Sequence, residues 1–359
     1  MTLRPVENTG TESELEADRQ GYEALIELNR RRAHPGGSIL DAPETVSSVW
    51  GTEHQSLWAR GEPFMLVGPD GTGKTSLGEQ LALAMIEVHQ SSLLGYNVEP
   101  VGRVLYLACD RPSQARRSMR RMVTEDDRAQ LDERLMVWEG PLPFDLGSEP
   151  GGLLAMARYY RCDALFVDSV KDGAADLSRE ETGLGINRAF QECVTEGIEV
   201  AALHHQRKQQ NGAGKPNRLS DVYGSRWIVA GCGSVVMLWG EAGDPVVELT
   251  HLKQPDQTVG PLQLVHDHEH GRTTVLERVD ALTLIEDASS GMTAEAIAEH
   301  LFGSAEPNNI RKARRQIDAL VKAGRVHRQD GARGGASGRE AATYYPVSLL
   351  HPGGGSCED

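Results

Sequence analysis

The chain has 359 residues, of which 39% are hydrophobic, 25% charged and 5% aromatic, and its formal net charge is −15. This composition is typical of a globular protein and excludes fibrous and wholly disordered chains, while the length favours one large domain with a smaller second one. An evenly spread negative charge would repel nucleic acid, so any contact with DNA must come from local basic segments.

The five cysteines stand singly, without the paired spacing of a zinc site or a disulfide framework, and are expected to be reduced. No stretch approaches the roughly 18 apolar residues that a membrane span needs, and the first twenty residues lack the basic and apolar regions of a leader. We therefore expect a cytoplasmic protein with no membrane partner.

Residues 1–45 form a polar, acidic N-terminal arm. A helical pattern over residues 21–33 closes at His34-Pro35-Gly36-Gly37. Two interpretations stay open for this arm, a solvated tail or an oligomerisation arm.

Residues 46–279 are predicted to form an α/β domain. Apolar runs alternate with helical patterns, which predicts a mainly parallel sheet with helices on both faces. The predicted strands are 63–67, 103–108, 164–167 and 199–203, and the helices are 74–89, 113–122, 152–160 and 179–196. Closely spaced strands at 234–239, 246–252, 262–265 and 273–277 then predict an antiparallel end to the sheet.

A phosphate-binding loop lies between the first of these strands and its helix. The segment matches the pattern G-x-x-x-x-G-K-[ST], and the residues assigned to nucleotide binding are Gly68, Pro69, Asp70, Gly71, Thr72, Gly73, Lys74, Thr75 and Ser76. Glycines let successive backbone N–H groups converge on a phosphate at a helix N-terminus, and Lys74 reaches the β- and γ-phosphates. Thr75 would hold Mg²⁺ through its hydroxyl. The alternative is a glycine-rich turn that carries a lysine by chance.

A second acidic residue is needed for the metal, and Asp168 ends the apolar run 164–167. Ligands of parallel sheets bind at the carboxyl edge of the strands, which is where this carboxylate would emerge. Asp168 is therefore the Walker B candidate, whereas Asp163 begins the same strand and would lie at the opposite edge.

Over about residues 48–275 the sequence resembles the RecA-like ATPases, in particular the RepA/DnaB group of hexameric replicative helicases. Leu93-Leu94-Gly95 followed by the run from Arg103 to Asp110 looks like the family's second strand, which ends in the acidic residue that polarises the attacking water. This chain has Asp110 where the family usually has Glu, and an Asp reaches about one methylene less far. A helix-capping role for Asp110 before Pro112 is the alternative.

The same resemblance assigns roles to residues that follow two later strands. Leu203 to Lys208 resembles the strand end that senses the γ-phosphate, with Gln206 or His205 as the sensor. The next loop, 209–221, faces nucleic acid in the family. The DNA-contact candidates are Arg207 and Lys208 directly before it and Lys215 and Arg218 within it; a merely soluble basic loop is the alternative. Leu252-Lys253-Gln254-Pro255 resembles the strand end whose cation reaches a neighbouring subunit's nucleotide. Lys253 is the candidate, with Arg226 and Arg218 as rivals, and the lack of a guanine motif favours ATP.

Residues 280–350 resemble a winged helix-turn-helix domain, followed by a loose tail at 351–359. Thr293 can cap one helix, and the next, from Pro307 to Gly324, exposes a basic side. Its DNA-contact candidates are Arg311, Lys312, Arg314 and Arg315. Residues 328–339 would form the wing, and such domains place the basic helix in the major groove. A winged helix that contacts protein is the alternative.

These features predict an ATP-hydrolysing, Mg²⁺-dependent motor on DNA of the replicative-helicase type. The resemblance implies a homo-oligomer, a hexamer above other assemblies, with single-stranded DNA in the core channel and duplex DNA at the winged helix. Two alternatives remain: a DNA-binding regulator that ATP switches, and a recombination mediator without unwinding activity.

Overall fold

The computed structural model describes residues 19–24, 26–27, 29–207, 215–276, 280–288, 290–331 and 341–347. The chain divides into two compact units, the first Met1–Leu262 with His266–Thr273 and the second Gln263–Val265 with Thr274–Asp359. Of the N-terminal arm, residues 19–24 and 26–27 are helical, and two 3₁₀ helices follow, η1 (Arg30–Arg32) and η2 (Gly36–Asp41).

A nine-stranded sheet forms the centre of the first unit, in the order β13-β12-β11-β10-β3-β9-β8-β6-β7. Its strands are β3 (Phe64–Gly68), β6 (Val104–Ala108), β7 (Leu135–Glu139), β8 (Ala164–Asp168), β9 (Glu199–His205), β10 (Ser234–Trp239), β11 (Val246–Lys253), β12 (Leu262–Asp267) and β13 (Arg272–Val275). From β10 to β7 all neighbours are parallel, while β10 and β11 are antiparallel. The predicted mostly parallel α/β sheet with an antiparallel end is confirmed.

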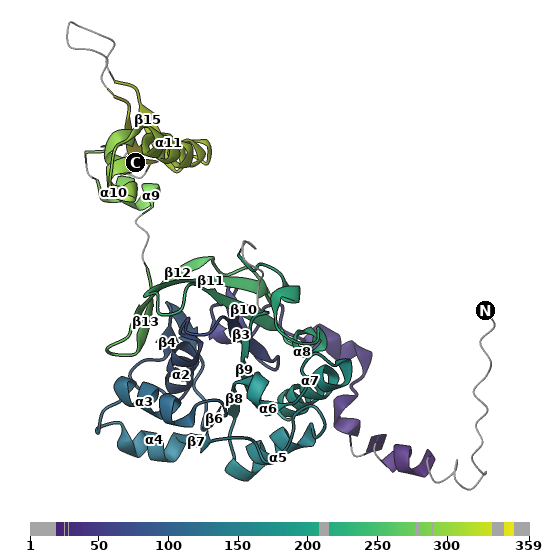
Figure 1. Cartoon of the computed structure of the whole chain (residues 1–359). Coiled ribbons are helices and arrows are strands. Elements are labelled where there is room, and N and C mark those ends of the chain that lie inside the picture. The colour runs from purple at the N-terminus through teal and green to yellow at the C-terminus, as the bar shows by residue number, and fades with distance from the viewer. Residues whose placement is uncertain are drawn as a thin grey trace, which may run out of the picture. The chain divides into compact units, whose positions relative to one another are not determined.

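Helices cover both faces of this sheet, with α2 and α3 on one side and α5 and α7 on the other (Figure 1). The helices of the unit are α2 (Lys74–Met85), α3 (Pro112–Met122), α4 (Arg128–Arg134), α5 (Gly151–Tyr160), α6 (Val170–Gly173), α7 (Glu180–Thr195) and α8 (Trp227–Ala230). Helix α2 ends before the predicted residue 89, because Glu87 and His89 adopt positive φ angles of 60° and 70°.

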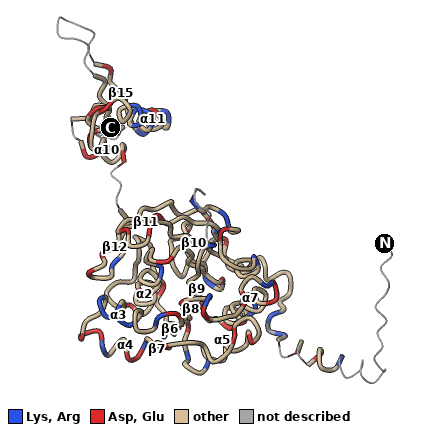
Figure 2. The backbone as a smooth tube through the Cα atoms, viewed as in Figure 1, with Lys and Arg blue, Asp and Glu red and all other residues tan. Residues whose placement is uncertain are grey.

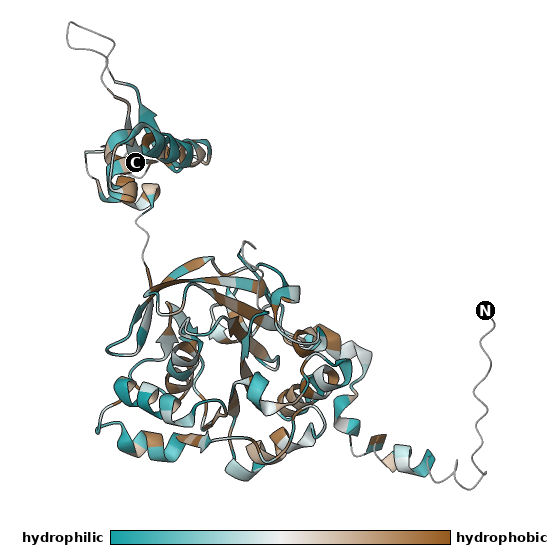
Figure 3. Ribbon diagram, viewed as in Figure 1, coloured by the Kyte–Doolittle hydropathy of each residue, from teal (hydrophilic) through white to brown (hydrophobic). Residues whose placement is uncertain are grey.

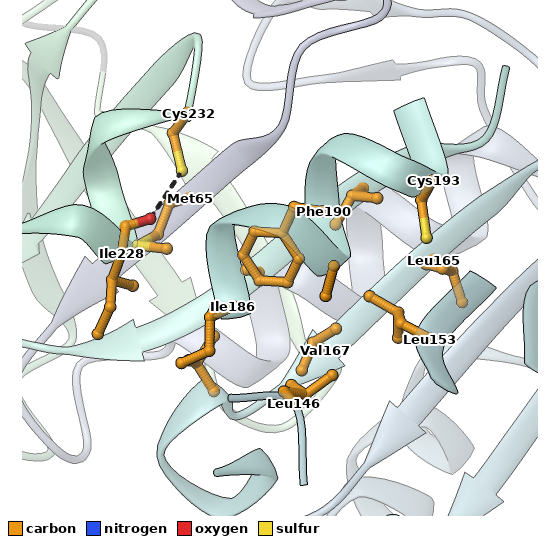
Figure 4. Close-up of a cluster of buried hydrophobic side chains, with 14 of the residues drawn as sticks. Met65, Leu146, Leu153, Leu165, Val167, Ile186, Phe190, Cys193, Ile228 and Cys232 are labelled. Carbon is orange, nitrogen blue, oxygen red and sulfur yellow. Dashed lines mark hydrogen bonds between the residues drawn. The ribbon is translucent and has the colours of Figure 1, made fainter. Parts of the chain in front are cut away.

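The core strands are buried along their whole length, as expected for a sheet covered on both sides. Val167 and its neighbours on one face pack against Ile186 and Phe190 of α7 (Figure 4). On the other face Phe64 stacks on Trp58 with ring centroids 5.6 Å apart. Alternating side chains of each strand therefore enter two separate apolar layers. The hydrophobic residues of these strands are coloured brown in Figure 3.

A second, four-stranded sheet in the order β2-β1-β5-β4 was not predicted from the sequence. It consists of β1 (Ser48–Gly51), β2 (Ser56–Ala59), β4 (Ser92–Leu93) and β5 (Tyr96–Val98). Trp50 and Trp58 are fully buried in it. The strands have two to four residues each, which is too short for alternation to be recognised.

The second unit contains α9 (Ala281–Asp287), β14 (Met292–Thr293), α10 (Ala294–Phe302), α11 (Pro307–Lys322), β15 (Val326–Gln329) and β16 (Thr343–Pro346). The three strands pair in the order β14-β16-β15. Ile285, Ile297 and Ile317, one from each helix, form its core with Tyr344. Thr293 caps α10 as predicted, since its hydroxyl accepts a hydrogen bond from Ala296 N at 3.2 Å. Most of the predicted wing, residues 332–339, and the tail lie outside the described residues.

Candidate nucleotide site

A pocket of about 270 Å³ lies at the carboxyl ends of the central strands. It is lined by Asp70, Gly71, Gly73, Lys74, Thr75, Ser76, Ala108, Asp110, Arg111, Gln114, Ala115, Arg121, Asp168, Ser169, His205 and His268. Residues from the predicted P-loop and from the ends of β6, β8 and β9 thus meet at one edge of the sheet.

The loop between β3 and α2 has the backbone that the glycine pattern predicts. Gly71 and Gly73 have φ angles of 77° and 84°, which side chains other than glycine rarely adopt. At Gly68, a Cβ atom would lie 2.5 Å from the carbonyl oxygen of Leu238 on β10. The Thr72 hydroxyl donates to the Pro69 carbonyl at 2.9 Å and closes the loop.

Lys74 begins α2 with its side chain turned back into the loop, where Nζ donates to the Pro69 carbonyl at 2.7 Å. The residue is only 8% exposed. Burial lowers the pKa of Lys74 to about 8, against the opposing effect of Asp70, Asp168 and Asp110. A phosphate would offer this ammonium group a stronger acceptor than a single carbonyl does.

Asp168 ends β8 and is buried beside Lys74. Tyr106 of β6 donates its hydroxyl to Oδ2 of Asp168 at 2.9 Å, and the Thr75 hydroxyl also hydrogen-bonds this carboxylate. Burial raises the pKa of Asp168, and these hydrogen bonds oppose the shift. Tyr106 was not recognised from the sequence, where it reads as one more apolar strand residue.

The donor set suits Mg²⁺, which prefers oxygen ligands and usually takes one or two from protein and the rest from phosphate and water. Thr75 and Asp168 supply a hydroxyl and a carboxylate oxygen within hydrogen-bond range of each other. The described part of the chain contains no cluster of three His, Cys, Asp or Glu that could hold a metal without such help.

Asp110 follows β6 and lines the pocket with its side chain 46% exposed. Its Oδ2 atom lies 3.6 Å from Nε of Arg111. Arg111, not Asp110, is the N-cap residue of α3, and no side chain caps that helix. The capping alternative for Asp110 is therefore wrong. Two cations that line the pocket, Arg111 at the N-cap of α3 and Arg121 within the helix, carried no signal in the sequence beyond a basic helix.

At the end of β9, His205 and not Gln206 lines the pocket. Nδ1 of His205 lies 2.8 Å from Oδ1 of Asp70, and Nε2 lies 3.5 Å from the Ser169 hydroxyl. Gln206 points elsewhere and its Oε1 atom is buried without a partner among the described residues. The P-loop, the Asp168 strand and β9 therefore meet at the imidazole of His205.

The remaining candidate cations lie outside the pocket. Lys208 is outside the described residues, and Lys215 pairs with Glu248 and donates to the Thr250 hydroxyl at 2.7 Å. Arg207 donates to the Gly224 carbonyl at 3.5 Å, and Arg218 is exposed. The rival Arg226 lies over the Trp227 ring, 5.3 Å from its centroid.

Lys253 lies at the edge of the sheet opposite the P-loop. It pairs with Val235 near the start of β10, whereas Gly68 ends the neighbouring parallel strand. Its Nζ atom donates to the Ala230 carbonyl at 3.1 Å. Lys253 therefore does not reach the pocket of its own chain.

The basic side of α11 is exposed in the second unit, where Figure 2 shows Lys and Arg residues along the helix. Arg314 pairs with Glu295 at 2.9 Å, and Nζ of Lys312 lies 5.5 Å from the centroid of the Phe302 ring. Arg311 donates weakly to the Pro307 carbonyl at 3.4 Å, and Arg315 is exposed.

Comparison with known families decides the class of the pocket. Residues 34–211, which include the P-loop, Asp110, Asp168 and His205, match the family described as "AAA domain". The core is a P-loop ATPase domain. No curated protein matches the chain in sequence.

Solved structures similar to the ATPase core include an ATPase domain with 16% identity and a TM-score of 0.46, over 71% of this chain and 98% of that one. Another is a KaiC-like protein from the hyperthermophilic archaeon Pyrococcus horikoshii, with 14% identity and a TM-score of 0.42, over 60% of this chain and 90% of that one. Among the described residues, none of the helices combines the length and the apolar character needed to cross a membrane.

Proposed function

We propose that the chain is an ATP-driven motor on DNA of the replicative-helicase type, which works as a ring of identical subunits, a hexamer. The ATPase pocket supplies the energy, and the ring places each pocket beside a cation of the next subunit. The observation that carries this proposal is the position of Lys253 relative to the pocket.

Within one pocket the chain's own side chains bind the nucleotide and position the attacking water. Lys74 binds the β- and γ-phosphates, and Thr75 with Asp168 would hold Mg²⁺, which neutralises phosphate charge when bound. Asp110, half exposed at the pocket rim, orients the attacking water and accepts its proton. His205 contacts Asp70 of the P-loop and so registers the γ-phosphate from the end of β9. Such sites act mainly by positioning and charge stabilisation.

Lys253 completes the pocket of the neighbouring subunit. It is aligned with Val235, and Val235 pairs with Met65, three residues before Gly68, so it lies on the order of 10 Å back along the strands from the P-loop. The Lys253 ammonium group is therefore too far from the P-loop to contact a phosphate bound in its own chain. A head-to-tail ring would bring this edge of one subunit to the carboxyl edge of the next.

DNA contacts come from two basic surfaces. The first is the loop after β9, whose two ends are joined by the bridge between Gln206 and Val222; it contacts single-stranded DNA. The second is the exposed basic side of α11, which contacts duplex DNA. Among the described residues, Arg218 and Arg315 are exposed, whereas Lys215 and Arg314 are already paired with carboxylates.

Strand displacement on a forked DNA substrate tests the motor proposal directly. We expect ATP hydrolysis that single-stranded DNA stimulates, together with separation of the fork that requires ATP. Stimulated hydrolysis without separation would instead indicate a recombination mediator. ATP-dependent DNA binding without stimulated hydrolysis would indicate a regulator that ATP switches.

A mixing experiment tests the shared site. Lys253→Ala and Lys74→Ala proteins, each inactive alone, should regain part of the ATPase activity when mixed, because a Lys74→Ala subunit can donate an intact Lys253 to an intact P-loop. Wild-type hydrolysis by Lys253→Ala alone would transfer the role to Arg218 or Arg226. A mixture that stays inactive after confirmed subunit exchange would contradict sharing through Lys253.

A further inference from the structure

His266 lies behind the P-loop on β12, outside the lining of the nucleotide pocket. Its ring is buried, with 6% of the residue exposed. Nε2 lies 3.1 Å from the carbonyl oxygen of Thr72 in the P-loop, and Nδ1 lies 2.8 Å from the Thr273 hydroxyl on β13. One imidazole therefore joins the phosphate loop to the β12–β13 hairpin.

The hydrogen-bond partners determine where the ring proton lies. A carbonyl oxygen only accepts, so Nε2 of His266 must carry the proton and donate it to Thr72. Nδ1 then accepts from the Thr273 hydroxyl, whose oxygen in turn accepts from Nε2 of Gln80 at 2.9 Å. Every polar atom of this chain of bonds has a suitable partner when the ring is neutral. Burial also lowers the pKa of His266, which favours the same neutral form.

The network is anchored at both ends. Oε1 of Gln80 on α2 accepts from the backbone N–H of Thr273 at 2.7 Å, and Nε2 of Gln80 also donates to the Ser76 carbonyl at 2.9 Å. The P-loop itself leaves room for the ring: a Cβ atom at Gly73 would lie 2.4 Å from Nε2 of His266. Gly73 is thus needed for the approach of His266 as well as for its positive φ angle.

The Thr72 carbonyl belongs to the peptide group that also carries the Gly73 N–H. In a trans peptide these two groups point in opposite directions. Holding the Thr72 oxygen on the His266 side therefore aims the Gly73 N–H away from His266. That is the direction required of a P-loop amide that binds a phosphate.

We propose that His266 is a positioning residue of the nucleotide site, which holds the Thr72–Gly73 peptide in its phosphate-binding orientation through a proton on Nε2. The proposal rests on nucleotide binding at the P-loop, though not on motor activity or DNA binding. His266 contacts the loop from behind, so it sets nucleotide affinity without touching the phosphate.

Nucleotide affinity of the full-length chain tests this role, with a fluorescent ADP analogue as the probe and kcat and KM for ATP measured beside it. We expect His266→Ala to weaken binding about tenfold, in keeping with the loss of one buried hydrogen bond and the freeing of a loop peptide. KM should rise more than kcat falls. His266→Gln, which keeps an N–H donor near the Nε2 position, should recover most of the affinity.

Thr273→Val provides a milder variant that keeps side-chain shape and removes only the hydroxyl. It should weaken binding about threefold, because the ring loses the donor that fixes its tautomer. His270→Ala is the matched control from the same hairpin, since His270 is exposed and its ring pairs with Asp267 at the end of β12. Its affinity should equal that of the wild type.

Nitrogen NMR of ¹⁵N-histidine-labelled protein reads the ring directly. We expect a protonated Nε2 and an unprotonated Nδ1 for His266, and a proton on Nδ1 would overturn the proposal. Equal nucleotide affinity in the wild type and in a folded His266→Ala protein would also overturn it. If His266→Ala does not fold, the nucleotide affinity of Thr273→Val and the ring spectrum of the wild type test the proposal instead. Failure of the wild type itself to bind the ADP analogue would overturn nucleotide binding, and the ring spectrum would still decide the tautomer.

Discussion

Lys74 of the ATPase pocket and the cations of α11 are placed in opposite ways. Lys74 is 8% exposed, and Asp70, Asp168 and Asp110 all act on its charge. The Arg314 side chain on α11 is 55% exposed and pairs with a Glu295 side chain that is itself 39% exposed. Charges interact strongly where water is excluded and weakly where water and salt screen them. A single residue can therefore determine the pocket, whereas α11 must act through the sum of its charges.

The largest loss of ATP hydrolysis is expected from a substitution inside the pocket. Lys74→Ala should abolish ATP hydrolysis, because it removes the P-loop cation that faces the β- and γ-phosphates, while the fold persists because the side chain contacts the loop rather than the core. Phosphate release and thermal melting measure the two properties. Lys322→Ala at the end of α11 is the control and should hydrolyse at the wild-type rate. Turnover near wild type in Lys74→Ala would remove Lys74 from the site.

A smaller loss is expected at the pocket rim. Asp110→Asn should keep nucleotide binding and lower kcat by about 10²-fold, the usual contribution of a general base. Asp110→Glu restores both the charge and the longer reach usual in the resembled family, so it should hydrolyse ATP at least as fast as the wild type. If both variants hydrolyse at the wild-type rate, Asp110 does not activate water.

Motifs at strand ends could be predicted from the sequence because strand direction alone brings them together. The P-loop and Asp168 meet at one edge in this way, and Lys253 falls at the other. Tyr106 and His266 could not be predicted, since their roles depend on which strands are neighbours. Tyr106 reaches Asp168 only because β6 lies beside β8. Which of His205 and Gln206 lines the pocket could not be predicted either, because it depends on the side of β9 to which each side chain points.

Side-chain burial also predicts a stability effect near the pocket. Glu79 on α2 is fully buried, and burial raises its pKa to about 8. The native protein keeps a proton that the unfolded chain loses above roughly pH 4.5, so this group makes stability fall as pH rises from about 4.5 to 8.

Glu79→Gln is neutral in both states and removes that dependence. It should stabilise the protein by about 4 kcal/mol near pH 7.5, with the gain shrinking to about 0.4 kcal/mol near pH 4.5. Melting curves across this range measure the difference, and Glu299→Gln, an exposed change on α10, should show none. A constant difference at all pH values would mean that Glu79 is ionised in the native protein.

The smallest effect is expected on α11 and concerns the least constrained cation of its basic side. Arg315 is exposed, and its removal should leave the fold and the ATPase rate unchanged. If α11 contacts duplex phosphates, Arg315→Ala should weaken duplex binding only a few-fold and lower the slope of log affinity against log salt by about one. Changing Arg311, Lys312, Arg314 and Arg315 together should lower the slope by about four and remove most of the affinity, because screened charges contribute almost independently. Fluorescence anisotropy with a labelled duplex at several salt concentrations measures both quantities, and single-stranded DNA serves as the comparison for the loop after β9. Duplex affinity and salt slope that are unchanged in the fourfold variant would instead make this basic helix a surface for protein contacts.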